Sequence, residues 1–291
     1  MRGSMMRQGL RIGRLGCVLA CAWLWVGCND GERARLAQQP IQQTYFGRVA
    51  EVVLEDLARH QRGLRYAADR VAMGFERAKP ERIEQEMRQV LKVIRSPKRG
   101  VRELVISPMS FMAAVGSDGR VIARDSEPDR MKGMDVAARF PVVAAALAGK
   151  AGYAIGEFES DQEGGESSVT ILMAAPAHYR GKVVGALLLG IPLWRLSQRL
   201  SKQLQLEYGT GGRVLWVYAY RGERLFHHGT PPDLDQMVPD AAARRAGYAR
   251  SPGGFTGVVQ QYGFTYGYGV RPLRVLGPDT GVILFHMDPD T

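Results

Sequence analysis

The pattern of apolar residues after position 45 predicts a long amphipathic helix. From Phe46 to Phe75, apolar side chains recur at intervals of three and four residues, which places them on one stripe of a helix of about 30 residues. Lys79-Pro80 interrupts the stripe, and Glu81 to Ile94 restarts it with a proline in the first turn. Such a helix either forms the seam of a homodimer or supports the domains that follow, and the sequence leaves both alternatives open.

After residue 100 the pattern shortens to runs typical of strands and turns. The turn Ser117-Asp118-Gly119 separates a first strand, read over 101–115 with a break at Pro108, from a second at 120–124. The further predicted elements are a helix at 135–148, strands at 153–158, 168–175 and 182–190, and a helix from Pro192 to about Leu204. Antiparallel strands joined by short turns, with helices between them, indicate an α+β fold.

The second half of the chain repeats this order. Residues 215–220 and 224–226 predict a hairpin, and 233–245 a helical segment. Two landmarks recur: Ala246-Gly247-Tyr248-Ala249 matches Ala151-Gly152-Tyr153-Ala154, and Gly277-x-x-x-Gly281 matches Gly181-x-x-x-Gly185. These coincidences predict an internal duplication.

Four segments carry a resemblance to a known family. They are Phe111-Met-Ala-Ala-Val-Gly-Ser-Asp-Gly-Arg-Val-Ile-Ala-Arg, Lys132-Gly-Met-Asp, Ala146-Leu-Ala-Gly-Lys, and Ala174-Ala-Pro-Ala-His-Tyr-Arg-Gly-Lys-Val-Val-Gly-Ala-Leu. With the long helix before them, they resemble the extracellular PAS-like sensor domains called Cache domains. The resemblance implies a helical segment at 43–100, a PAS-like domain with an antiparallel sheet at 101–205, and a shorter second one at 206–291.

The N-terminus has the layout of an export signal. Four arginines without an acidic residue precede a short apolar run that ends at Gly27-Cys28. This junction resembles the bacterial lipoprotein signal, which implies removal of residues 1–27, acylation of Cys28, and a polar tether over 28–42. The protein is then expected in the bacterial cell envelope, held to membrane lipid and facing the periplasm or the exterior. A plain signal peptide or a short uncleaved anchor remains the alternative.

Cysteine use and charge exclude several classes of protein. The three cysteines are Cys17, Cys21 and Cys28, so a processed chain has no disulfide framework and no cysteine metal site. Removal of residues 1–27 takes away four arginines and no acidic residue, which lowers the net charge from +10 to +6. No dense basic patch with stacking aromatics stands out, and no nucleic-acid partner is expected.

The candidate chemistry does not form a catalytic set. The five histidines include no helical pair of the metalloprotease type, and no serine has the setting of a hydrolase elbow. The acidic stretch at 157–166 lacks the spacing of a calcium loop and is interpreted as a hairpin connection. We therefore expect no enzyme, no cofactor and no bound metal.

The PAS-like resemblance implies a small-molecule pocket between the first sheet and its facing helix. The residues expected to line it are Phe111, Arg124, Met134, Phe140 and Tyr153, with Ala113, Met131 and Met173 beside them. The guanidinium of Arg124 would suit a carboxylate ligand. In the alternative interpretation these side chains fill a core.

Aromatic residues gather in the second half. Trp216, Tyr218 and Tyr220 alternate along one strand, and Tyr266 and Tyr268 along another, so that each set shares a face. Trp216, Tyr218, Tyr266 and Tyr268 are the candidates for binding a partner protein or a glycan, and packing against the long helix is the alternative. The sequence as a whole predicts a lipid-anchored, non-catalytic sensor that binds a small ligand and acts through an envelope protein. A structural or assembly lipoprotein that docks through the second domain is the second hypothesis.

Overall fold

The long helix begins earlier than the sequence pattern predicts. The computed structural model describes residues 31–158 and 167–289. Within them the chain is helical from residue 31 through one π-helical turn, η1 (Ile41–Tyr45), to the end of α2 (Phe46–Arg77). Residues 31–42 are therefore helix rather than the expected tether, and Cys28 lies outside the described residues.

The early start of the helix has a physical reason. Ala37, Ile41 and Tyr45 are buried at intervals of four residues and extend the apolar stripe of α2 toward the N-terminus. The polar residues between them face solvent, which is why the composition of this segment suggested a tether. Three buried side chains among the fifteen residues 31–45 give too weak a pattern to predict a helix from the sequence.

Three short helical segments follow α2. They are η2 (Pro80–Arg82), α3 (Ile83–Ile94) and α4 (Arg102–Val105). α3 folds back on α2, where Gly74 lies against Met87 and Val90. The strand expected over 101–115 forms only from Phe111, because the first part of this run is α4, whose Leu104 is fully buried against Gly63 of α2.

The first sheet has five antiparallel strands in the order β2-β1-β5-β4-β3. Its strands are β1 (Phe111–Gly116), β2 (Val121–Arg124), β3 (Gly152–Phe158), β4 (Ser168–Tyr179) and β5 (Lys182–Pro192). The helices α5 (Val136–Arg139) and α6 (Pro141–Leu147) connect β2 to β3, and α7 (Leu193–Tyr208) leaves the end of β5.

The second sheet has the same strand order, β7-β6-β10-β9-β8. Its elements are β6 (Val214–Arg221), β7 (Arg224–Phe226), η3 (Pro232–Met237), α8 (Ala241–Arg250), β8 (Phe255–Gln261), β9 (Phe264–Pro272), η4 (Arg274–Leu276) and β10 (Thr280–Met287). Two sheets with one topology agree with the predicted duplication, and β5 and β10, which carry one pair of matched glycines, hold equivalent positions.

The predicted match between residues 246–249 and 151–154 is wrong. Residues 246–249 lie in α8, whereas their supposed counterpart at 151–154 enters β3. The Asp240 side chain accepts a hydrogen bond from the Ala243 N–H at 2.7 Å, which caps the start of α8. The helix continues through Gly247 because the ring of Phe255 packs on that glycine. The strand equivalent to β3 is β8, which begins at Phe255.

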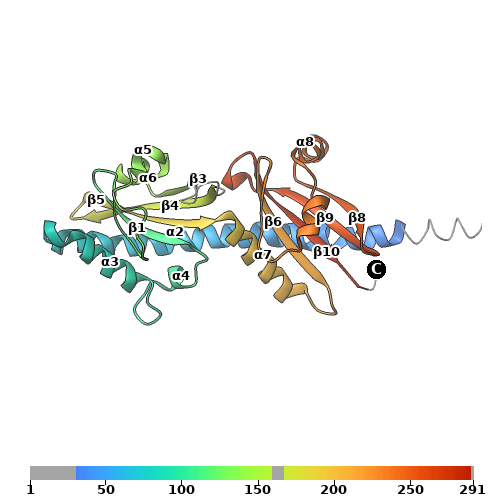
Figure 1. Ribbon diagram of the computed structural model, residues 1–291, viewed down its shortest axis with the longest axis horizontal. Helices are drawn as coiled ribbons and strands as arrows, with labels where there is room; N and C mark the ends of the chain where they lie inside the picture. Colours follow the sequence, from blue (N-terminus) through green and yellow to red (C-terminus); the bar gives the residue numbers. More distant parts are fainter. Residues whose placement is uncertain (1–30, 159–166, 290–291) are drawn as a thin grey trace, which may run out of the picture.

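One layer of the core runs the length of the molecule. Figure 1 shows α2 and the helical segment before it lying along both sheets, with the first sheet over the C-terminal part of the helix and the second over its N-terminal part. Side chains from the helix, β5 and β10 belong to one buried cluster, including Val49, Leu187 and Leu284. The opposite face of each sheet carries a separate cluster, which is covered by α5 and α6 in the first sheet and by η3 and α8 in the second.

We predict that Gly267→Ala lowers the free energy of unfolding by about 2 kcal/mol, as overpacking typically does. A Cβ at Gly267 in β9 would collide with the backbone carbonyl of Ala37, which cannot rotate away. Urea denaturation of the full-length chain measures the change. Gly47→Ala is the control, because nothing lies within 4 Å of its added Cβ, and it should gain up to ~1 kcal/mol from helix propensity. An unchanged midpoint for Gly267→Ala would contradict the docking of residues 31–40 on β9.

Candidate ligand-binding site

The outer face of the first sheet, turned away from α2, carries a cluster of three phenylalanines. The ring of Phe158 lies 5.4 Å from Phe111 and 5.0 Å from Phe140, measured between centroids. Phe111 comes from β1, Phe158 from β3, and Phe140 from the junction of α5 and α6. The phenylalanine cluster therefore connects two separate strands of the sheet, β1 and β3, to the helices that cover this face.

Two glycines make room for these rings. Gly190 of β5 pairs with Phe111, and a Cβ at position 190 would enter the phenylalanine ring. Gly156 of β3 leaves space in the same way between Phe140 and Leu172. The phenylalanine cluster thus occupies volume that strand side chains would otherwise fill.

Two arginines lie over the phenylalanine cluster. The Cζ of Arg124 is 5.7 Å from the centroid of Phe111, and the Cζ of Arg139 is 5.5 Å from Phe140 and 5.9 Å from Phe158. The side chain of Arg124 is 23 % exposed, and its buried Nε has no hydrogen-bond partner among the described residues. In the part of the chain that the structure describes, Arg124 has an ion pair with Asp125, whose Oδ1 lies 3.9 Å from that Nε. Arg124 therefore retains hydrogen-bonding capacity beside an aromatic surface.

The backbone around Arg124 is held by two aspartates. Asp129 Oδ2 accepts from the Arg124 N–H at 2.8 Å, and Asp129 Oδ1 accepts from the N–H groups of Met131 and Lys132, both at 3.1 Å. The fully buried Asp125 carboxylate accepts from the Met112 N–H at 3.0 Å and from the guanidinium of Arg95. These bonds fix the segment after β2 and with it the base of the Arg124 side chain.

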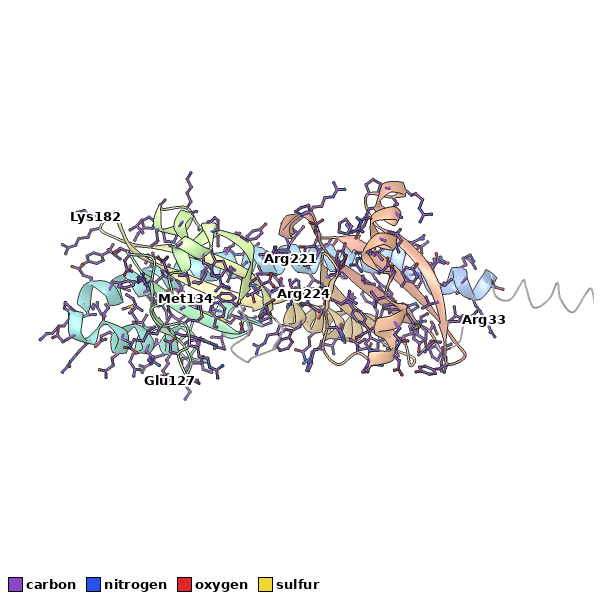
Figure 2. The ribbon with its side chains drawn as sticks, turned by 45° about the horizontal axis from the view of Figure 1, so that its top comes forward. Arg33, Glu127, Met134, Lys182, Arg221 and Arg224 are labelled. Atoms are coloured by element: carbon purple, nitrogen blue, oxygen red, sulfur yellow. The ribbon has the colours of Figure 1, made fainter. Side chains whose placement is uncertain are left out.

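The structure brings together four of the five predicted ligand-binding residues. Phe111, Met134 and Phe140 belong to the hydrophobic cluster on the outer face, and Arg124 lies over it. Ala113 and Met131 also belong to this cluster. Figure 2 shows Met134 in the half of the molecule that contains the first sheet, which we call the first lobe; the half with the second sheet is the second lobe. Tyr153 is the exception, because it pairs with Met173 and both pack in the cluster against the long helix, on the opposite face. Successive strand residues point to opposite faces, so Tyr153 and Met173 cannot line the site that Phe111 faces.

Sequence reasoning missed Phe158 and Arg139. Phe158 shares its face of β3 with Gly156 and Ala154, two and four residues earlier, so a period of two places it on the face opposite to Tyr153. No comparable signal identified Arg139, whose position depends on how α5 packs on the sheet.

The aromatic residues of the second sheet are mostly interior. Trp216, Tyr218, Tyr266 and Tyr268 lie together on its outer face, and Trp216 stacks on Tyr266 at 6.2 Å between centroids. Tyr218 is fully buried, Tyr266 is 6 % exposed, and burial raises the pKa of both hydroxyls. Buried side chains cannot meet a partner in this conformation, so the predicted partner surface is reduced to Trp216 and Tyr268. The exposed aromatics are instead Tyr262 and Phe264 at the β8–β9 turn.

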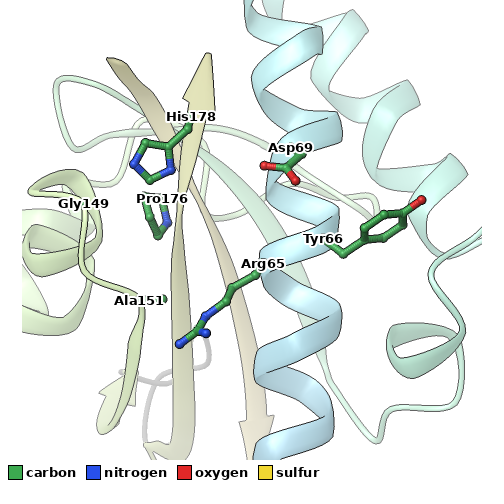
Figure 3. A pocket seen from close by; sticks show the side chains of 7 residues that line it. All are labelled: Arg65, Tyr66, Asp69, Gly149, Ala151, Pro176 and His178. Atoms are coloured by element: carbon green, nitrogen blue, oxygen red, sulfur yellow. The ribbon is translucent and has the colours of Figure 1, made fainter. Parts of the chain in front are cut away.

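An open cavity of about 520 Å³ lies on the other side of the first sheet, beside α2. Figure 3 shows the side chains of Arg65 and Asp69, on successive turns of α2, directed toward the strand that carries His178. Tyr66 points away from the cavity in the same view. Arg65, Asp69 and His178 are all exposed, so this cavity offers charge but little apolar enclosure.

Residues 31–158 and 167–289 offer no candidate for a metal site or a membrane span. In these ranges no group of three or more His, Cys, Asp or Glu side chains could hold a metal ion. No helix in the same ranges has both the length and the apolar character to cross a bilayer. The acidic stretch that was interpreted as a hairpin connection lies mostly outside the described residues.

Comparisons with known proteins identify the fold. No family model and no curated protein matches the chain. The sensor domain of the Vibrio cholerae histidine kinase DctB superposes with a TM-score of 0.50 at 14% identity, over 85% of this chain and 95% of that one. The ligand-binding domain of the Campylobacter jejuni chemoreceptor Tlp3, in complex with L-norvaline, gives 0.54 at 11% identity, over 84% and 88%. The periplasmic domain of Vibrio cholerae LuxQ gives 0.53 at 11% identity, over 84% and 98%.

The fold is Cache-like. The long N-terminal helix and two five-stranded antiparallel sheets match this arrangement along most of the described chain. Cache-like domains in these solved structures are sensor or ligand-binding parts of receptors. At sequence identities below 15%, these similarities show the fold alone, and any ligand has to be inferred from the residues of this chain.

Proposed function

We propose that this chain is a non-catalytic sensor of the cell envelope and that it binds a small ligand with a carboxylate on the outer face of the first sheet. The observation that carries the proposal is Arg124, whose side chain is 23 % exposed above the ring of Phe111 and makes no hydrogen bond with the described residues. A guanidinium with free donors matches the fork of a carboxylate, and the phenylalanine cluster offers an apolar surface for the rest of the ligand. The Cache-like fold supports a sensor role.

Attachment and output follow from the two ends of the long helix. We propose that Cys28, three residues before the first described helical residue, is acylated and holds the helix to a membrane. Helix α2 packs against β4 and β5 of the first sheet, so a ligand that shifts this sheet would shift the helix. A partner protein at the helix, or a second copy of the chain packed along it, would receive the signal.

We predict that one class of small carboxylates raises the melting temperature of the full-length chain and that Arg124→Ala abolishes the rise. A ligand that binds only the native state stabilises it by about 2.7 kcal/mol when present at 100 times its Kd. The measurement is a thermal-shift screen of amino acids, short carboxylates, purines and sugars. Arg180→Ala is the control, because Arg180 is exposed at the β4–β5 turn, away from the phenylalanine cluster.

Two results would count against the site. If no compound in the screen raises the melting temperature, the proposal that the chain is a small-ligand sensor is contradicted. A saturable response that Arg124→Ala leaves intact would keep the sensor and move its site elsewhere.

A second candidate function is a docking lipoprotein. Tyr262 is 68% exposed and Phe264 45% exposed at the β8–β9 turn, and the Tyr262 hydroxyl is bonded to Asp233. Exposed aromatics of this kind are common at protein interfaces. A flat ligand screen together with loss of a partner in Tyr262→Ser would favour this function over sensing.

A further inference from the structure

A cavity of about 550 Å³ lies where the two sheets meet. Its walls come from three separate elements: Val169 in β4, Trp194 in the first turn of α7, and Leu225 and Phe226 in β7. Figure 2 places Arg221 and Arg224 of the same hairpin between the two lobes. We call this cavity the junction crevice. It is distinct from the phenylalanine cluster, which lies on the outer face of the first sheet.

One histidine of the junction crevice is fixed by its neighbours. His227 Nε2 lies 3.2 Å from Asp235 Oδ2, and because a carboxylate only accepts, this nitrogen donates. His227 Nδ1 bonds with the Thr230 hydroxyl at 2.9 Å, and the Tyr218 hydroxyl donates to Asp235 Oδ1 at 3.0 Å. Both ring nitrogens of His227 are therefore occupied, and its ring, 4.6 Å from that of Tyr218, serves as a rigid wall.

The next residue has the opposite character. The ring of His228 lies 5.4 Å from that of Trp194 and makes no hydrogen bond or ion pair with the described residues. Its two nitrogens are therefore free to bond a ligand, beside the indole face that such a ligand would contact. The hydroxyl of Ser168, 3.2 Å from that of Thr170, adds a second polar group at the crevice.

Two arginines lie beside the aromatic walls of the junction crevice. The Cζ of Arg195 lies 5.0 Å from the Trp194 ring and that of Arg224 lies 5.1 Å from the Phe226 ring. Arg224 is paired with Glu157, at 2.6 Å between Nη1 and Oε1. Among the described residues, the hydrogen-bond partner of Arg195 Nη1 is the neutral carbonyl of Met109, at 2.6 Å. Within residues 31–158 and 167–289, Arg195 therefore has no acidic partner, and its guanidinium at the aromatic wall would attract an anion.

We propose that the junction crevice binds a planar aromatic carboxylate, with its ring against Trp194 and Phe226 and its carboxylate bonded by His228. The volume exceeds that of one aromatic ring, and the apolar walls, the free imidazole and the positive charge of Arg195 match the two ends of such a molecule. Because β4 and α7 provide one wall and β7 the other, the ligand would bind the two sheets to each other. This site goes beyond the proposed function, since it needs neither Arg124 nor the outer face.

The test titrates benzoate into the full-length chain that carries Trp216→Phe. Trp194 is then the tryptophan at the junction crevice, and the same titration of Trp194→Phe/Trp216→Phe provides the signal of Trp23 and Trp25 as background. We expect a saturable change in Trp194 fluorescence and a matching heat in calorimetry. His228→Ala should weaken binding about tenfold or more, as loss of a charge-assisted hydrogen bond does. Benzyl alcohol, which keeps the ring and lacks the charge, should bind weakly by comparison.

The control variant is Tyr248→Phe, at another cavity of about 510 Å³ in the second sheet, and it should leave benzoate binding unchanged. The proposal is overturned if the Trp194 signal does not saturate, or if His228→Ala binds benzoate as the unaltered chain does. Equal affinity for benzyl alcohol overturns the assignment to an anion. Since Arg124→Ala should not change benzoate affinity, failure here and failure of the proposed sensor site are read separately.

Discussion

Asp56→Ala is expected to lower the free energy of unfolding by about 3 kcal/mol, the cost of breaking a buried ion pair from one side. Asp56 lies on α2, is 5% exposed, and is bonded to two arginines. Arg199 of α7 donates to it through Nε and, at 2.9 Å, through Nη2, and Arg59 donates at 2.7 Å. The pKa of Arg199 is raised, first by its hydrogen bond to Asp56, which agrees with a strong pair. Removal of the carboxylate leaves two guanidinium groups, each on a side chain that is 29% exposed, without the anion that they share.

Urea denaturation at neutral pH measures this effect, and a second ion pair supplies the matched control. Glu207 pairs with Arg48 at 2.8 Å and also joins α7 to α2, but both side chains are 25% exposed. Glu207→Ala should therefore cost less than about 1 kcal/mol. Asp56→Leu combined with Arg199→Met should recover much of the loss, because both charges are removed together. A loss for Asp56→Ala no larger than that for Glu207→Ala would contradict the importance of this contact.

Acid is expected to destabilise the protein by about 3 kcal/mol as the pH falls from 6.5 to 4, through His60. His60 is 3% exposed, and burial is the main cause that lowers its pKa to about 4. The charge of Asp56 opposes this shift, and the charges of Arg59 and Arg199 add to it. Within this window the unfolded chain takes up a proton on His60 that the folded chain does not bind. The stability contributed by the neutral imidazole is thus present above pH 6.5 and is lost as the pH falls toward 4. Burial also lowers the pKa of His286, which adds to the loss.

The measurement is the free energy of unfolding in urea at a series of pH values. His60→Leu removes the titrating group and should flatten the profile between pH 6.5 and 4, leaving the smaller slope due to His286. His178→Leu, at an exposed position of β4, should keep the steep profile. An unaltered slope in His60→Leu would show that other groups control the acid sensitivity.

Much of the fold could be predicted because its signals are local. The interval of three and four residues between Phe46 and Phe75 marks α2, and glycine-containing turns mark the hairpins of both sheets. Two features were missed because they depend on distant contacts. Helix at residues 31–40 forms against β9, and the segment before β1 becomes α4 because Leu104 fits beside Gly63.

The candidate site was predicted less completely than the fold. Phe111, Arg124 and Phe140 lie close together, as predicted, because they flank turns and helices that the resemblance locates. Tyr153 was misplaced because the face of a strand residue depends on its register, and the pairing of Tyr153 with Met173 is a long-range property. The position of the Arg124 side chain over Phe111, and the contact of Phe158 with Phe111 and Phe140, depend on how the strands pair and cannot be read from the sequence.

The early start of the long helix also determines the order in which the protein can assemble. Ala37 bonds through its carbonyl to His286, a residue 249 positions later in the chain. During synthesis, the first helical turns therefore exist without their partner until the strand at 280–287 has been made. Contacts so far apart in sequence carry a high cost of chain closure and form slowly. The second sheet would then be the last part of the molecule to mature, and an emerging chain would expose Ile41 and Tyr45 to any chaperone that guides it.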